Sequence, residues 1–298
     1  MTDITVLDGS IGQEIVKRCG ARPTPLWSTS VMIEQPDSVR DVHLDYFRAG
    51  ATIATTNSYA VWPDRLEPAG IGDQHLNLLD ISAAQAKAAR DAFGSGRIAA
   101  SLGPLGASYR PDIVIPLEQA ATAFRTNAQR LSPHADMFLI ETVSSLNAAK
   151  GALMGCAGLG KPVWLALSVD DDDGTKLRSG EPLSGLSTLL QDHTPDAILL
   201  NCSRPEAISQ GLPHLAKLGL PFGAYANGFT HISDGFLGAA PTVDALTERH
   251  DLGPKDYAKF ALSWVDMGAT IIGGCCEVGP DHIRELAQQL TAAGHTIV

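Results

Sequence analysis

The sequence predicts an α/β fold, a (β/α)8 TIM barrel in which helices surround a closed parallel sheet. One observation is that eight short apolar segments, rich in β-branched residues, recur along the chain. Another is that the segments between them carry apolar residues at helical spacing. Apolar strands joined by crossover helices are typical of a parallel sheet buried on both faces. A doubly wound open sheet is the alternative, but no G-x-G-x-x-G motif follows the first predicted strand.

Predicted strands and helices alternate from one end of the chain to the other. The strands are expected at residues 3–7, 51–56, 97–102, 136–141, 162–168, 196–201, 220–226 and 269–274. The helices are expected at residues 38–49, 75–93, 117–131, 145–158, 183–192, 205–218, 255–267 and 281–293. The last two follow Pro254 and Pro280, and proline is favoured at helix starts because its missing N–H has no partner there.

Composition predicts one soluble globular domain spanning residues 1–298. The chain is 44% hydrophobic, and none of its apolar runs approaches the roughly 18 to 20 residues that a membrane span needs. No Ser/Gly-rich linker divides it, and barrels of about 250 residues often form one domain. The formal net charge of −11 argues against nucleic acid, whose binding depends on Lys and Arg. We therefore expect small-molecule partners, with neither nucleic acid nor membrane.

The start of the chain and its cysteines predict a cytoplasmic location. The opening segment, MTDITVLDGS, lacks the basic and apolar regions of a secretory signal. The 5 cysteines are an odd number in a long chain, which does not suggest a disulfide framework. A reducing compartment is expected.

Reactive side chains follow the predicted strands at the points where they end. Barrel enzymes gather their active sites at the C-terminal ends of the strands. The residues found there are Asp8, Asn57, Glu141, Cys202, Asn227, Cys275 and Cys276. The sequence therefore predicts an active site on this face of the barrel.

Cys202 ends the sixth predicted strand, and the adjacent pair Cys275 and Cys276 follows the eighth. Barrel closure brings these two ends together, so three thiolates can converge. Three sulfur ligands suit zinc and leave its fourth position for water or substrate. Gly273 and Gly274 are expected to let the chain turn so that both following side chains face the metal. The alternative is that the cysteines are buried thiols that pack as small apolar residues.

A zinc ion with three thiolate ligands carries a formal charge of −1, which makes it a weak electrophile. Such a site is better suited to binding an incoming thiol as thiolate and keeping that sulfur nucleophilic. The expected chemistry is alkyl transfer to sulfur.

The sequence resembles the homocysteine S-methyltransferase family over nearly its whole length. The matching segments are LDGSIGQEI at 7–15, HLDYFRAGATIATTNSY at 43–59, SLGPLGA at 101–107, IETVSS at 140–145, NCS at 201–203 and GGCCEVGPDHI at 273–283. The resemblance implies a zinc-dependent barrel enzyme that methylates L-homocysteine to L-methionine.

The resemblance also implies roles for particular residues. Three positions match the zinc ligands of the family, namely Cys202, Cys275 and Cys276. Asp8 and Gly9 match the amino-terminal substrate loop, and Glu141 matches the carboxylate that receives the amino group of homocysteine. The alternatives are a turn cap for Asp8 and a salt bridge to a barrel Arg or Lys for Glu141.

Other candidates for substrate contact have less specific signals. Thr55, Asn57 and Tyr59 alternate along one strand end and therefore share a face, although turn hydrogen bonding explains such residues as well. Asn227 is a further candidate at the end of the seventh strand. The run from Asp170 to Asp173 is expected to be a solvated loop.

The methyl donor is expected to be a small onium compound, with S-methylmethionine ranked first. A chain predicted to be a single domain leaves no room for separate folate or cobalamin modules. Segments 21–32 and 227–246 are candidate lids, and their Trp27, Phe229 and Phe236 could surround a cationic methyl group or simply pack the barrel mouth. The segment after the paired cysteines, starting at Glu277, departs from many relatives and leaves donor specificity open.

Two other functions compete with this hypothesis. A zinc-storing or thiol-redox-sensing protein would have a closed site or a reversible disulfide and would transfer no methyl group. An enzyme of the same kind could instead use a selenol or another small thiol as acceptor.

Overall fold

Strands and helices alternate in a computed structural model that describes residues 2–21, 24, 26–238 and 242–298. The strands are β1 (Asp3–Val6), β2 (Ile53–Thr55), β3 (Arg97–Leu102), β4 (Met137–Val143), β5 (Val163–Leu167), β6 (Ala197–Asn201), β7 (Phe222–Tyr225), β8 (Ile271–Ile272) and β9 (Thr296–Ile297). The α-helices are α1 (Ile11–Arg18), α2 (Thr29–Glu34), α3 (Pro36–Ala49), α4 (Pro63–Leu66), α5 (His75–Phe93), α6 (Leu117–Leu131), α7 (Leu146–Cys156), α8 (Leu186–Asp192), α9 (Pro205–Leu215), α10 (Pro254–Asp266) and α11 (Pro280–Ala292). Six short 3-10 helices are η1 (Glu67–Ala69), η2 (Gly72–Gln74), η3 (Leu183–Gly185), η4 (Ala216–Leu218), η5 (Asp234–Leu237) and η6 (Val243–Ala245).

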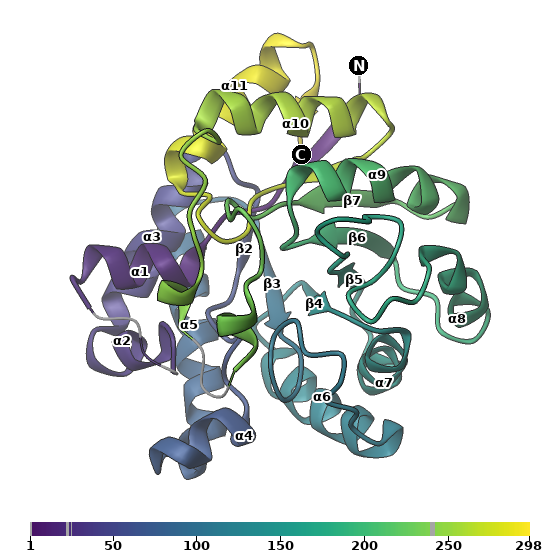
Figure 1. Cartoon of the computed structure of the whole chain (residues 1–298). Helices are drawn as coiled ribbons and strands as arrows, with labels where there is room; N and C mark the ends of the chain where they lie inside the picture. Colours follow the sequence, from purple (N-terminus) through teal and green to yellow (C-terminus); the bar gives the residue numbers. More distant parts are fainter. Residues whose placement is uncertain (1, 22–23, 25, 239–241) are drawn as a thin grey trace.

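All eight predicted strands are confirmed, and they form the predicted parallel barrel with helices around its outside (Figure 1). Neighbouring strands pair in the order β2 to β8 and then β1. The circle closes between β1 and β2, where Thr52 N–H donates to the Val6 carbonyl at 2.7 Å and Leu7 bridges Ile53. The additional strand β9 pairs with the start of β1.

The barrel strands separate two apolar layers. One layer consists almost entirely of strand residues and fills the inside of the barrel, as Ala99, Leu139 and Leu199 do. The other joins strand residues such as Ile198 and Leu200 to the surrounding helices. Successive strand residues point to opposite faces, so burial on both faces produces the continuous apolar runs seen in the sequence.

Three helices between β1 and β3 were not predicted. The helix α1 buries Ile11 and Ile15, which lie one turn apart, and its periodicity could have been recognised. The helices α2 and α4 have only 6 and 4 residues, too few for periodicity to identify. The helix α1 contributes Ile11, Gly12 and Gln13 to the lining of the cavity at the barrel mouth.

Within the described residues, no helix combines the length and apolar character needed to cross a bilayer.

The structure describes parts of both predicted lid segments, 21–32 and 227–246. Their residues 22–23, 25 and 239–241 lie outside the described residues.

Candidate active site and metal centre

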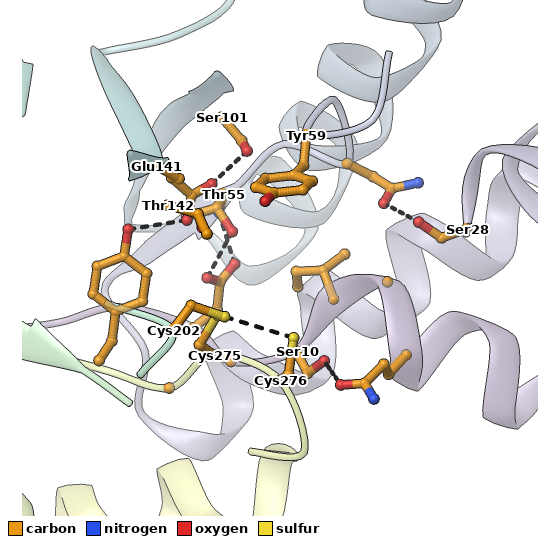
Figure 2. Close-up of a pocket in the computed structure, with 18 of the residues that line it drawn as sticks. Ser10, Ser28, Thr55, Tyr59, Ser101, Glu141, Thr142, Cys202, Cys275 and Cys276 are labelled. Atoms are coloured by element: carbon orange, nitrogen blue, oxygen red, sulfur yellow. Dashed lines mark hydrogen bonds between the residues drawn. A yellow bond between two sulfur atoms is a disulfide. The ribbon is translucent and has the colours of Figure 1, made fainter. Parts of the chain in front are cut away.

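The three predicted cysteines meet beyond the C-terminal ends of β6 and β8 (Figure 2). Their sulfur atoms all lie within 4.8 Å of one another. Cys202 and Cys275 form a disulfide, and the Cys202 and Cys276 sulfurs are 3.7 Å apart. The predicted convergence is confirmed, whereas the expectation of free thiols is not. The Cα atoms of Cys202 and Cys275 are 5.5 Å apart, a separation that a disulfide spans readily.

Backbone hydrogen bonds to β7 fix the two strand ends that carry the cysteines. Cys202 N–H donates to the Tyr225 carbonyl at 3.0 Å, and Cys275 N–H donates to the Ala226 carbonyl at 2.9 Å. The glycines before the pair serve close packing rather than the predicted turn. A Cβ at Gly273 would lie 2.5 Å from Leu7 Cβ, and one at Gly274 would lie 2.1 Å from a Val278 methyl carbon.

Glu141 is a buried carboxylate that faces the same cavity as the cysteines. It accepts hydrogen bonds from Ser101 Oγ and from the Tyr225 hydroxyl, the latter at 3.0 Å. Burial raises its pKa, and these two hydroxyl donors partly oppose that shift. No Lys or Arg among the described residues forms an ion pair with it, so the alternative of a structural salt bridge is wrong.

Asp8 is also buried at the cavity, but its oxygens are occupied by the end of β2. Its carboxylate accepts from Thr55 N–H at 2.6 Å and from Thr55 Oγ1 at 2.8 Å. Burial raises the pKa of Asp8 well above its usual value, and the nearby Glu141 contributes to that rise. Asp8 therefore joins the ends of β1 and β2, and Thr55 contacts this carboxylate.

The other predicted substrate residues differ in their placement. Gly9, Asn57 and Tyr59 line the cavity. Asn57 Oδ1 accepts from Ser28 Oγ at 2.6 Å, and the Tyr59 hydroxyl lies 2.7 Å from Ser108 Oγ.

Asn227 is buried behind the cavity and is not among the described residues that line it. Its Oδ1 accepts from Phe229 N–H at 3.2 Å, which supports the turn after β7.

Gly9 has no room for a side chain, because a Cβ there would lie 2.1 Å from the Val278 carbonyl oxygen.

An aromatic cluster forms the outer part of the site. The ring centroid of Trp27 lies 6.1 Å from those of both Tyr59 and Phe236, and Tyr109 lies 5.8 Å from Phe236. Phe229 belongs to the same apolar cluster. Of the three aromatic residues suggested by the sequence, Trp27 lines the cavity, while Phe229 and Phe236 pack behind the lining.

Left-handed backbone conformations gather around this site. The non-glycine residues with positive φ in the described part of the chain are Trp27, Tyr109, Thr142, Cys202 and Glu277. All but the last line the main cavity, and Glu277 lines the cavity beside it. Bulky and β-branched residues rarely adopt this conformation, and such strain clusters at functional sites.

Hydrogen bonds hold the most unusual of these residues in place. Thr142, with φ of 58°, donates its N–H to Asn201 Oδ1 at 3.1 Å and accepts from Asn201 Nδ2 at 3.0 Å. Sequence reasoning missed both residues, as well as Ser101, Tyr109 and Tyr225. Asn201 and Thr142 stand beside Cys202 and Glu141 in the sequence, so strand-end position was the available signal.

The sequence had suggested that the run from Asp170 to Asp173 is a solvated loop, but the structure shows that part of this run is buried. Asp172 is exposed, but Asp171 is buried and pairs with Arg178 at 2.8 Å. The expectation of a solvated run is therefore wrong for Asp171, because a cation seven residues later folds back onto it.

Comparison with known proteins agrees with this architecture. A sequence model of the homocysteine S-methyltransferase family matches residues 5–290. Homocysteine S-methyltransferase of Escherichia coli strain K12 is 30% identical over 303 residues, covering 95% of this chain and 94% of that protein. Homocysteine S-methyltransferase YbgG of Bacillus subtilis strain 168 is 28% identical, with 95% and 93% covered.

Solved structures give the same result. The homocysteine methyltransferase MmuM from Escherichia coli is 28% identical and superposes with a TM-score of 0.80 in its metallated form, covering 97% of this chain and 96% of that one. Its oxidized form, at the same identity and coverage, superposes with a TM-score of 0.82. With its cysteine cluster at the mouth of a shared barrel, this chain belongs to the homocysteine S-methyltransferase family.

Proposed function

We propose that this protein transfers a methyl group from a small onium donor to the sulfur of L-homocysteine, giving L-methionine. The reaction would take place at a zinc site formed by Cys202, Cys275 and Cys276, in a single domain spanning residues 1–298. The observation that carries the proposal is that three sulfurs lie within 4.8 Å of one another in a cavity that also contains the Glu141 carboxylate. Zinc binding first requires a thiol reductant, which reduces the Cys202–Cys275 disulfide to two thiols that can then lose their protons to act as thiolate ligands. A reducing cytoplasmic setting supplies such reductants.

The cysteine cluster fits a zinc ion by its chemistry. Thiolates are soft ligands that favour zinc over magnesium or calcium. Burial raises the pKa of the Cys276 thiol to about 12, so a thiolate there needs a positive charge beside it. Among the described residues, the potential metal-binding groups at this point are the three cysteines, which leaves a fourth position for substrate. When bound, zinc would act as a Lewis acid that stabilises the acceptor sulfur as thiolate.

Glu141 is placed to orient an amino-acid acceptor. Its partners Ser101 and Tyr225 are neutral hydroxyls, so the buried carboxylate lacks a compensating charge. The α-ammonium group of homocysteine would supply that charge through a charge-assisted hydrogen bond. Asp8 is less suited to this role because Thr55 already occupies both of its oxygens.

The aromatic cluster suits a cationic methyl donor. The faces of Trp27 and Tyr59 at the cavity can attract a sulfonium or quaternary ammonium group. In the reaction, the acceptor sulfur forms a bond to the methyl carbon while the bond from that carbon to the sulfonium sulfur breaks. The electron pair of the broken bond stays on the leaving sulfur, which becomes a neutral thioether, and the acceptor thiol proton passes to solvent. We rank sulfonium donors above betaine because a thioether is a better leaving group than an amine, and among the sulfonium donors we rank S-methylmethionine first.

A panel of methyl donors tests this proposal. Protein that has been reduced and loaded with zinc is incubated with homocysteine deuterated on its carbon chain and with S-methylmethionine, S-adenosylmethionine, betaine or a methylfolate. Deuterated methionine is expected with S-methylmethionine, because methionine made from the acceptor keeps the deuterium of homocysteine, whereas methionine left behind by the donor carries none. If no donor gives labelled methionine, the proposed function is wrong. If betaine gives the most labelled methionine, only the ranking of the donors is wrong.

A selenol is a second acceptor worth including in the same panel. Selenocysteine Se-methyltransferase of Brassica oleracea var. italica is 25% identical, with 96% of this chain and 89% of that protein covered. The competing hypothesis of a zinc-storing or redox-sensing protein would account for the Cys202–Cys275 disulfide. It is nevertheless not supported, since the relatives just described are methyltransferases.

A further inference from the structure

A buried tyrosine contacts one of the cysteine sulfurs from a separate loop. Tyr109 lies between β3 and α6, and its hydroxyl donates a hydrogen bond to Cys202 Sγ at 3.0 Å. Tyr109 and Cys202 are only 5% and 3% exposed, so bulk solvent has little access to this contact. In this structure that sulfur also forms the disulfide with Cys275. We propose that, once a thiol reductant has opened the disulfide, Tyr109 is a positioning residue that stabilises the Cys202 thiolate and thereby strengthens metal binding, and that Arg178 and Asp171 hold its ring in place.

The physical effect follows from the charge on the sulfur. A thiolate in a buried site is costly unless it is paired or hydrogen-bonded. An O–H donor at 3.0 Å lowers that cost and draws electron density from the sulfur. Partners of metal ligands also fix the orientation of the ligand, and losing them typically weakens metal binding by about 10- to 100-fold.

Arg178 packs over the face of the Tyr109 ring. Its guanidinium carbon lies 4.7 Å from the ring centroid of Tyr109, the arrangement of a cation–π contact. The left-handed backbone of Tyr109, with φ of 60°, is unfavourable for a bulky residue. Packing against Arg178 therefore helps to keep the hydroxyl directed at Cys202.

Asp171 anchors the arginine and connects it to a third loop. One carboxylate oxygen pairs with Arg178 Nη2 at 2.8 Å, and the side chains are 1% and 10% exposed. The other oxygen accepts from Ile232 N–H at 2.9 Å, in the segment after β7. Asp171 therefore compensates the buried charge of Arg178 and links the loop after β5 to the segment after β7. Loops after β3, β5 and β7 thus converge on Cys202.

This inference rests on the proposed metal site, and Tyr109→Phe is the direct test because it removes the hydroxyl and keeps the ring. We expect the variant to bind zinc about 10-fold more weakly in competition with a chromophoric chelator. With cobalt(II) in place of zinc, we expect its sulfur-to-cobalt charge-transfer band to move to lower energy, because a sulfur without the hydrogen bond gives up an electron more easily.

Tyr46→Phe is the matched control. Tyr46 is equally buried, and its hydroxyl donates to the Val278 carbonyl at 3.0 Å, near the paired cysteines but not to sulfur. This variant should keep the wild-type band energy. The double variant Asp171→Asn/Arg178→Met removes both charges of the ion pair together, and it should shift the band in the same direction as Tyr109→Phe.

The outcomes separate the two proposals. Wild-type protein that binds no metal through these cysteines would overturn both the proposed function and this inference. Wild-type protein that binds metal, together with unchanged affinity and band energy in Tyr109→Phe, would overturn the inference alone. An equal band shift in Tyr46→Phe would also overturn it, because the shift would then reflect general loosening of the site.

Discussion

The same strands build two regions of the barrel from opposite kinds of side chain. We call the inward-facing apolar residues of the strands the wall, and the residues that line the cavity at the C-terminal strand ends the mouth. Inside the wall, Ala99, Leu139 and Leu199 make apolar contacts and require no partner of a particular chemistry. A few residues further along the same strands, Ser101 and Glu141 are polar, buried and hydrogen-bonded to each other.

The left-handed non-glycine residues of the described chain also lie at the mouth. The wall is therefore organised for stability, whereas the mouth maintains backbone strain and buried carboxyl groups, features that cluster at functional sites. Substitutions in the two regions should consequently fail in different ways.

The largest effect is expected at the cysteine cluster. Cys276→Ala should lose its equivalent of zinc, and methyl transfer should fall to background, while far-UV circular dichroism stays unchanged. Chelation of the wild type should act in the same way, and zinc rather than magnesium should restore activity. A Cys276→Ala variant with full zinc and full activity would refute the metal site; unfolding on chelation would make the metal structural.

A substitution in the wall should lower the stability of the protein and leave substrate binding unchanged. Leu199→Ala opens a cavity inside the barrel, and the free energy of unfolding should fall by about 2–5 kcal/mol. The KM for homocysteine of the remaining folded protein should not change. Urea denaturation and steady-state kinetics measure the two quantities, with Val114→Ala at a site that is 70% exposed as the control. A large change in KM with little loss of stability would contradict the division between wall and mouth.

Glu141→Gln tests the buried charge at the mouth. The amide keeps the shape of the side chain but loses the charge that would bind the α-ammonium group. A charge-assisted hydrogen bond contributes about 1.5–3 kcal/mol, so the KM for homocysteine should rise about 10- to 100-fold. Glu118→Gln, on the exposed face of α6, should leave KM unchanged. An unchanged KM in Glu141→Gln would remove Glu141 from substrate binding.

The smallest effect is expected from His43, which is fully buried on α3 next to Asp8. Burial lowers its pKa from 6.5 to about 3, and its Nδ1 lies 4.0 Å from Asp8 Oδ2, too far for a hydrogen bond that would oppose this shift. Between these two pKa values the unfolded chain takes up a proton that the folded protein does not. The contribution of His43 to the free energy of unfolding therefore has its full value above pH 6.5, and it decreases as the pH falls from 6.5 toward 3, because proton uptake by His43 favours the unfolded chain.

The loss attributable to His43 should amount to about 1 kcal/mol between pH 7 and pH 5.5. Urea denaturation of the wild type and of His43→Leu at both pH values isolates it, because other titrating groups are shared by the two proteins. Two stability curves that run parallel in pH would show that folding does not lower the pKa of His43.

The sequence by itself determined the eight strands, most of the helices and the meeting point of the three cysteines. These features depend on local periodicity and on the rule that parallel strands end on one face, both of which are visible in a single chain. Even so, the short helices α2 and α4 carried too few residues for a period to appear.

Only the tertiary structure decided which polar groups satisfy one another. Thr55 binds Asp8 across 47 positions of sequence, and Tyr109 reaches Cys202 across 93. Asp171 appears in the sequence as one member of an acidic run, yet it is buried because Arg178 and the Ile232 N–H meet it in space. A buried polar group must find a partner wherever the fold places one, and that choice is made by long-range packing rather than by neighbours in the chain.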